Sequence, residues 1–411
     1  MIKICLCVKI HIPAVQANYR FSDIRENHRY FDENAAAEHV RNVYKNNLAP
    51  FFAGLRSVHY QSDAKFKAGV SASGISLTLL QKYAPKAIEE LAQLEKRNCI
   101  ELLSEPWSHS LLPYFDEQEL SRQVDLHDKT VYALFGKIPG LFVVHSPVFK
   151  PNIPEMVSSL GKEAVFMNLN PLDDEGFKKM VLKKQENSSP TPVLPINHKL
   201  SRMLQKIDLN PFMKSTADFS KRVVNRFKSS VTDSNPVVVM YDITSAKGPF
   251  RLSRAVTWKR VLMDLLADKG VFFISPEKAV KSYKSFVNKN NLFRNVIYRS
   301  RITNKWLRNK LQKEAFDKQL KINSAMKTEE RKLFIKEWDI LQDMEYLYYM
   351  DNHFNKQEFA ESHYNPHPNT NLAFINYINI LNDFWHRLQD KKITFKNKAQ
   401  PYYKNQYQNE K

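Results

Sequence analysis

Four polar side chains in the first 250 residues stand at or near the ends of short apolar runs, and their types could do chemistry. They are His11, Glu105, His145 and Asp242. A carboxylate such as Asp242 can transfer a proton, accept hydrogen bonds from hydroxyl groups or be held by neighbouring donors. Three histidines, counting His109, and one carboxylate also suit a zinc ion. The spacing of these ligands in space follows only from an assumed fold, so we expect neither a metal nor another cofactor.

Seven apolar runs rich in β-branched residues have the length and bounds of buried strands. They span residues 5–10, 66–70, 99–103, 141–144, 164–167, 237–241 and 271–274. Stretches long enough for a helix separate most of these runs, which favours parallel strands joined by crossover helices. Because the carboxyl ends of parallel barrel strands meet at one mouth, the polar residues that follow the runs are expected to gather there.

Composition and periodicity divide the chain into parts. Its 411 residues, 43% apolar and 12% aromatic, can bury a large core and suggest two or more folding units. We expect a barrel over residues 1–290, in which about 185–236 form a proline-interrupted loop or insertion, and a helical domain over 291–390. Residues 391–411 are polar and basic, and we expect this tail to be disordered.

The formal charge of +19 needs an interpretation. From Lys278 to Lys313 there are eleven lysines or arginines and no acidic residue. A solvated basic face, with an acidic partner as the alternative, accounts for this segment. A polyanion-binding protein would also carry such a segment, but no recognisable nucleic-acid motif accompanies it, so a nucleic-acid partner is not expected.

The remaining composition bears on the compartment. No run of 18 or more uncharged apolar residues occurs, so a membrane-spanning helix is not expected. Lys9 and His11 interrupt the first run, which therefore reads as a strand and not as a secretory signal. Cys5, Cys7 and Cys99 have neither metal-ligand nor disulfide-framework spacing. They fit core positions in a reducing cytoplasm.

Several separated motifs resemble glycoside hydrolase family 57, the α-amylase-like group. Residues 4–13, with His11-Ile12-Pro13, resemble the family's first strand, which ends in His-Gln-Pro. Residues 66–74 and 103–111 are similar to its Phe-Lys-Val-x-Phe-Ser-Ile-Ser-Gly and Leu-Ala-Glu-Thr-Tyr-x-His-Ser-Leu segments. Further matches in the same order are residues 19–24, 311–317, 346–350 and 373–377.

The resemblance implies an α/β fold, an incomplete (β/α)7 TIM-like barrel with an α-helical C-terminal domain, that acts on α-glucans by a retaining mechanism. That chemistry needs two carboxyl groups about 5 Å apart. Asp242 stands at the family's acid/base position, whereas Ser146 stands where the family carries its nucleophilic glutamate. A serine has no negative charge with which to stabilise an oxocarbenium-like centre. We therefore expect a protein that recognises α-glucans, such as glycogen or starch, and whose hydrolysis is lost or impaired.

The resemblance and the strand-end positions also assign substrate binding. The candidates are His11, Glu105, Trp107, His109, His145 and Glu345. Trp107 could instead be plain core, and Glu345 an exposed helical residue. Two other functions stay open: an active retaining hydrolase or transferase in which Glu105 or Glu345 supplies the missing charge beside Asp242, and a zinc site made by the three histidines and Asp242.

Overall fold

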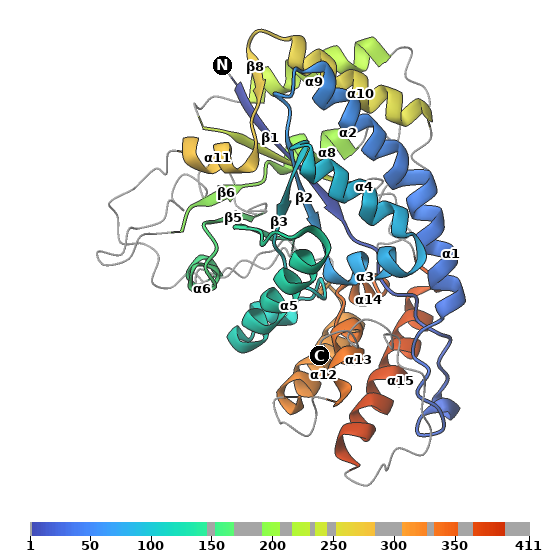
Figure 1. The fold of residues 1–411 in the computed structure, drawn as a ribbon. Helices are drawn as coiled ribbons and strands as arrows, with labels where there is room; N and C mark the ends of the chain where they lie inside the picture. The colour runs from blue at the N-terminus through green and yellow to red at the C-terminus, as the bar shows by residue number, and fades with distance from the viewer. Residues whose placement is uncertain are drawn as a thin grey trace.

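The computed structural model describes most of the chain in nine stretches. They are residues 2–145, 153–167, 191–205, 216–230, 235–244, 252–283, 306–326, 333–351 and 365–390. Figure 1 shows strands surrounded by helices in the upper part of the molecule and a group of C-terminal helices below them. Ser146, the tail 391–411 and most of the basic segment lie outside these stretches.

Seven parallel strands form a ring. Their bounds are β1 (Ile2–Ile10), β2 (Ala68–Ala72), β3 (Ile100–Leu103), β4 (Leu141–Val144), β5 (Ala164–Met167), β6 (Val193–Pro195) and β7 (Val237–Asp242). Ladders join β3, β2, β1 and β7 in one sheet and β4, β5 and β6 in another. Two parallel bridges, Ser104 to Phe142 and Ile196 to Val238, connect the sheets. The result is the incomplete TIM-like barrel that the sequence predicts.

One member of the ring differs from the expectation. The segment expected as a loop or insertion contributes β6, which pairs with β5, and two helices, α8 (His198–Gln205) and α9 (Thr216–Ser230). The last apolar run forms β8 (Val271–Phe273), which pairs only with the first residues of β1. With three residues and a proline at its end, β6 is too short to give a periodic signal.

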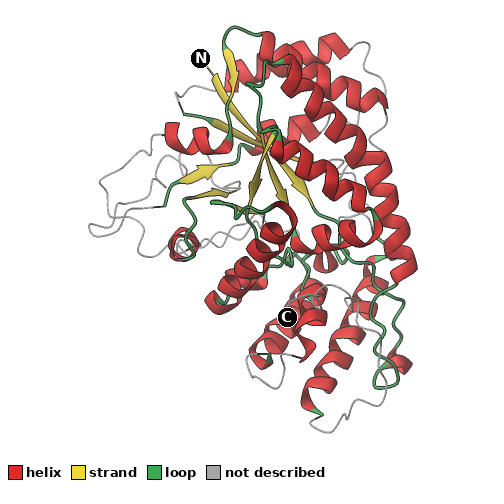
Figure 2. Cartoon of the chain, in the orientation of Figure 1, coloured by secondary structure: helices red, strands yellow, loops and turns green. Residues whose placement is uncertain are grey.

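Helices cover the ring and build the second domain. Around the barrel lie α1 (Glu33–Val43), η2 (Tyr44–Leu48), α2 (Ala49–Gln61), α3 (Gly74–Tyr83), α4 (Pro85–Lys96), η3 (Leu112–Tyr114), α5 (Glu117–Phe135), α6 (Ile153–Ser159), α10 (Leu252–Ala267) and α11 (Pro276–Ser282). The short helix η1 (Phe21–Asp23) belongs to the loop after β1, which packs against the C-terminal helices. The C-terminal helices are α12 (Lys310–Ala325), α13 (Ile335–Leu341), α14 (Glu345–Tyr348) and α15 (Thr370–Gln389). Figure 2 shows that the described part of this domain is helical.

The two faces of β1 pack into different apolar clusters. Ile4, Leu6 and Val8 belong to the large core between the strands and their covering helices. Cys5 and Cys7 point the other way, into a cluster with residues of β3 to β7. Because side chains alternate along a strand, Lys9 shares the face of the two cysteines and points into the barrel.

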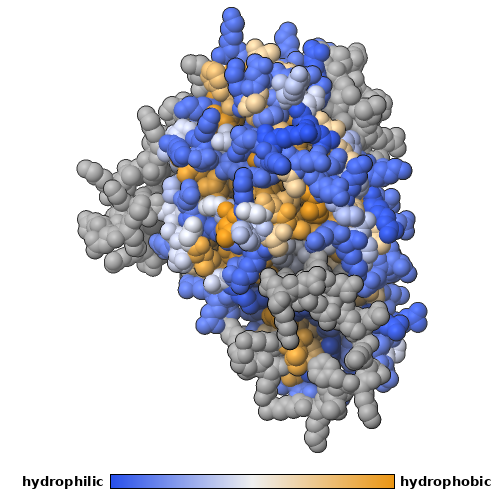
Figure 3. All heavy atoms as spheres, in the orientation of Figure 1, coloured by the Kyte–Doolittle hydropathy of each residue, from blue (hydrophilic) through white to orange (hydrophobic). Residues whose placement is uncertain are grey.

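The surface is mainly polar. Figure 3 shows hydrophilic side chains over most of the described face, with apolar side chains gathered near its middle. None of the described helices combines the length and the apolar character needed to cross a bilayer.

Candidate active site

Four of the predicted residues meet at the carboxyl ends of neighbouring strands. His11 follows β1, Glu105 and His109 follow β3, and His145 follows β4. The His11 and His109 rings stack with centroids 3.9 Å apart, and the His145 ring lies 5.4 Å from that of His109. His109 has a backbone φ of 50°, an uncommon left-handed conformation for a residue with a Cβ. The barrel therefore has the histidine-lined mouth that its strand ends predict.

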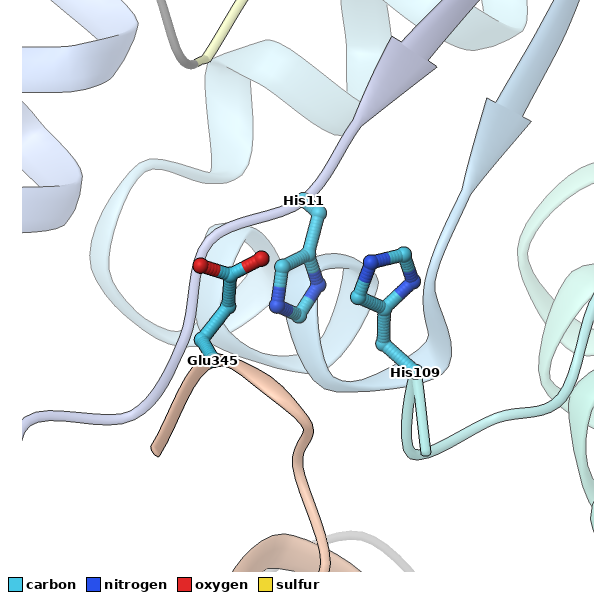
Figure 4. A group of neighbouring side chains, drawn as sticks. All are labelled: His11, His109 and Glu345. Carbon is cyan, nitrogen blue, oxygen red and sulfur yellow. The ribbon is translucent and has the colours of Figure 1, made fainter. Parts of the chain in front are cut away.

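The helical domain completes this cluster from the other side. The backbone amide of Met344 donates to the carbonyl of His109 (3.2 Å), and a bridge pairs Ser110 with Asp343. Asp343 places its Oδ2 3.1 Å from Nε2 of His11. Figure 4 shows Glu345 on the opposite side of His11 from His109. Ligating atoms of these three residues all lie within 4.8 Å of one another. Glu345 is 1% exposed, so it is a buried neighbour of this cluster and not an exposed helical residue.

Glu105 is surrounded by polar side chains that come from the barrel. Ser71 Oγ donates to its Oε1 (2.7 Å), Nδ1 of His109 donates to its Oε2 (3.0 Å), and Nε2 of His145 lies 3.6 Å from Oε1. Burial alone would raise the pKa of this carboxyl, but His145 and His109 overcome that effect and hold the pKa well below its usual range. Glu105 is therefore an ionised carboxylate enclosed by donors.

His109 presents a free acceptor atom to the site. Burial, together with the nearby His11 and Lys9, holds the pKa of His109 well below its usual value, so the ring is neutral. Its proton is assigned to Nδ1 because that nitrogen faces the ionised Glu105. Nε2 is then a bare lone pair, buried and without a hydrogen-bond partner among the described residues. A ligand hydroxyl would supply the partner that this atom lacks.

Asp242 is held by its own set of donors. It ends β7, and the register places it beside Lys9 of β1. Nζ of Lys9 lies 3.2 Å from its Oδ2, while the Thr244 amide (3.0 Å) and hydroxyl (2.8 Å) both donate to Oδ1. Lys9 and Thr244 thereby stabilise the ionised form of the carboxyl group. Gln205 of α8 exchanges two hydrogen bonds with the Asp242 backbone.

Trp107 is enclosed at its predicted position. Its indole Nε1 donates to Thr130 Oγ1 (3.0 Å), and its ring packs over Gly74 so closely that a Cβ there would lie 1.8 Å from Cδ1. With 6% exposure, the ring packs within the barrel core and positions the start of α3.

The donor atoms of the zinc hypothesis do not surround one point. Imidazole lone pairs lie in the ring plane, and the His11 and His109 planes are only 23° from parallel. Two such rings do not direct nitrogens at one ion about 2.1 Å from each. Glu345, and not Asp242, joins these two histidines within ligand range, and Asp242 is bonded to Lys9. The described geometry suits hydrogen bonding better than metal ligation.

Sequence reasoning missed three residues of the site: Lys9, Ser73 and Asp343. Ser73 Oγ lies 2.8 Å from Nδ1 of His11 and also caps α3, which orients the histidine ring. The placement of Lys9 had a signal, since a lysine two residues after the apolar Cys5 and Cys7 falls on the inward face of the strand. Asp343 follows no barrel strand, so the strand-end pattern gave no signal for it.

Known proteins resemble the chain in sequence and in fold. Residues 5–290 match the sequence model of glycosyl hydrolase family 57. A Methanocaldococcus jannaschii protein, described provisionally as an alpha-amylase, is 23% identical over 363 residues, which cover 79% of this chain and 72% of that protein. The branching enzyme of Pyrococcus horikoshii superposes with a TM-score of 0.62 at 12% identity, covering 93% of this chain and 89% of its own.

A longer enzyme shares the same fold. The 4-alpha-glucanotransferase of Thermococcus litoralis superposes with a TM-score of 0.52 at 14% identity over 86% of this chain, which spans about half (51%) of that enzyme's length. The family match covers well over half of the present chain. The chain therefore belongs to glycosyl hydrolase family 57.

Proposed function

We propose that this protein recognises α-glucan chains at the barrel mouth and that its hydrolytic activity is lost or strongly impaired. One observation carries the proposal. Among the described residues, Asp242 and Glu105 are carboxylates at the ends of barrel strands, and both already accept hydrogen bonds or an ion pair from protein donors. A retaining hydrolase needs one carboxyl to attack the sugar and one to protonate the leaving oxygen. At the nucleophile position, the sequence has Ser146, which has no charge to contribute.

The same groups support sugar recognition. Glucose hydroxyls both donate and accept, so they pair with ionised carboxylates and with a neutral imidazole nitrogen. Nε2 of His109 is such an acceptor, and Asp242 keeps 18% of its side chain exposed. The relatives named for α-glucan chemistry make α-glucans the substrate class that this site fits best.

The test measures binding and turnover on the same preparations. Calorimetry with maltoheptaose should give a saturable heat for the natural chain and a weaker one for Asp242→Asn and His109→Ala. Reducing-end release from maltoheptaose and glycogen should be absent from the natural chain and gained in Ser146→Glu. Turnover by the natural chain that disappears in Asp242→Asn would overturn the proposed loss of hydrolysis.

Glu345 supports a second candidate, an active hydrolase or transferase in which this residue replaces the missing carboxylate. It lies inside the site beside His11 and His109, whereas Glu105 is enclosed by Ser71 and two histidines. Under this alternative, the natural chain turns over maltoheptaose, and Glu345→Gln abolishes turnover while Glu105→Gln lowers it less. Equal activity in the natural chain and Glu345→Gln would exclude that role.

A further inference from the structure

Lys9 is a charged residue buried in the mouth of the barrel. Its side chain is 10% exposed. Lys9 belongs to β1, the strand that pairs with β2, β7 and β8. A lysine in such a place is costly unless a carboxylate balances it. Its Nζ meets Oδ2 of Asp242 at 3.2 Å. The register that pairs Lys9 with Asp242 is set by the ladder between β1 and β7, so the contact is built into the barrel.

Lys9 also lies within the field of the other carboxylates. Burial lowers the pKa of this lysine, but Asp242, Glu345 and Glu105 outweigh burial and raise it above its usual value. The ammonium form of Lys9 is therefore stabilised by all three carboxyl groups, of which Asp242 is the one in direct contact with it. The remaining described neighbours of Asp242, Thr244 and Gln205, are neutral.

A general acid must carry a proton at the working pH, and in a retaining hydrolase the nucleophilic carboxylate nearby favours that protonated state. Both influences are reversed in this chain. A positive charge lies against Asp242. The family resemblance implies that Ser146, a neutral residue, stands where the family carries its nucleophilic carboxylate.

We propose that Lys9 converts the acid/base position into a permanently ionised acceptor: its ammonium keeps Asp242 deprotonated, so that Asp242 binds sugar hydroxyls and has no proton to give to a leaving oxygen. Lys9 is thus a positioning residue that acts through Asp242. The role of Asp242 in binding sugar rests on the proposed function. The ionisation of its carboxyl group does not depend on that function.

The experiment follows the carboxyl carbon of Asp242 by NMR in the full chain labelled with ¹³C-aspartate, the resonance being assigned by its loss in Asp242→Asn. An aspartate ordinarily titrates near about 3.9. In the natural chain, the signal should stay at the ionised position from pH 8 down to about 5, because the ammonium stabilises the anion. In Lys9→Met, the midpoint should rise by more than one pH unit, because the Asp242 anion then loses the adjacent ammonium that stabilises it.

Two controls separate charge from structure. Lys9→Arg keeps the charge and should titrate like the natural chain. Lys162→Met removes another buried lysine, paired with Asp128 away from the mouth, and should leave the Asp242 signal unchanged. Titration of Asp242 above pH 5 in the natural chain would overturn the proposal without any variant, and so would identical curves for the natural chain and Lys9→Met.

Maltoheptaose calorimetry on the natural chain tests the proposed function separately. Absence of binding with the expected titration would remove glucan recognition and leave the Lys9–Asp242 assignment in place. Binding of maltoheptaose together with a protonated Asp242 near neutral pH would support glucan recognition and overturn the Lys9–Asp242 assignment.

Discussion

Asp242 in the barrel and Asp383 in the helical domain are two hydrogen-bonded carboxylates that are held in different ways. Asp383 of α15 is fully buried and accepts hydrogen bonds from the Arg25 amide, His28 Nδ1 and the Tyr30 hydroxyl. All three donors belong to the one segment that follows β1. Burial would raise the pKa of Asp383, but these donors lower it below its usual value.

Asp242 is partly exposed, and its described side-chain partners are Lys9 and Thr244. Among the described residues, the mouth also contains an acceptor without a hydrogen-bond partner, His109 Nε2. The comparison separates two uses of buried charge. Where a carboxylate ties a loop to a helix, its oxygens are satisfied by the protein itself. Where a site is kept for a ligand, some hydrogen-bonding capacity is left over for the ligand.

The largest expected effect concerns catalysis at the mouth. Adding Lys9→Met to Ser146→Glu should raise reducing-end release from maltoheptaose at least about 100-fold over Ser146→Glu alone, the lower range of general-acid contributions. Ser146→Glu with Lys9→Arg is the matched control and should gain nothing. Equal rates with and without Lys9→Met would show that the ammonium does not limit proton transfer.

The next effect concerns stability at the other carboxylate. Asp383→Ala should lower the free energy of unfolding by about 3 kcal/mol, because it removes the acceptor of the buried Tyr30 hydroxyl and of the part-buried His28 and Arg25 donors. Urea unfolding followed by circular dichroism measures the change. Asp125→Ala removes an exposed carboxylate paired with exposed Lys129 and should change stability by less than about 0.5 kcal/mol. A loss as small as this in Asp383→Ala would contradict the structural role.

Gly74→Ala should cost about 2 kcal/mol, because its Cβ would overlap the Trp107 ring. Gly54→Ala in α2 meets nothing within 4 Å and should instead stabilise the protein by up to about 1 kcal/mol. Thermal unfolding of both variants checks the contrast. A neutral Gly74→Ala would show that Trp107 moves easily and has space to turn toward the mouth.

The smallest effect is a pH dependence. The pKa of His109 is lower in the folded protein than its unfolded value of about 6.5, so its neutral ring stabilises the fold fully above that pH. The contribution is lost as the pH falls from about 6.5 toward the folded pKa, at up to about 1.4 kcal/mol per pH unit. Urea unfolding at several pH values should show a shallower slope for His109→Gln than for the natural chain. Parallel slopes would mean that His109 is already charged in the folded protein.

Local patterns predicted the elements that depend on local physics. Helix α5 shows such local signals: its N-cap is Asp116 and its left-handed C-cap is Gly136, residue types that mark helix ends because capping is decided within a few residues. The strands β1, β4, β5 and β7 begin or end within a few residues of their predicted runs, since a strand buried on both faces must be apolar throughout. The sequence did not predict β6, because a strand of three residues is too short to show an alternating pattern.

The candidate site was predictable only in part. Strand-end positions brought out His11, Glu105, His145 and Asp242, because parallel strands direct their carboxyl ends to one mouth. By itself, the sequence determined the barrel, the helical domain and the residue types at the mouth. Tertiary structure decided that Lys9 meets Asp242 and that Asp343 and Glu345 enter from the helical domain. These contacts depend on strand register and domain packing, which join residues hundreds of positions apart and leave no periodic trace in the chain.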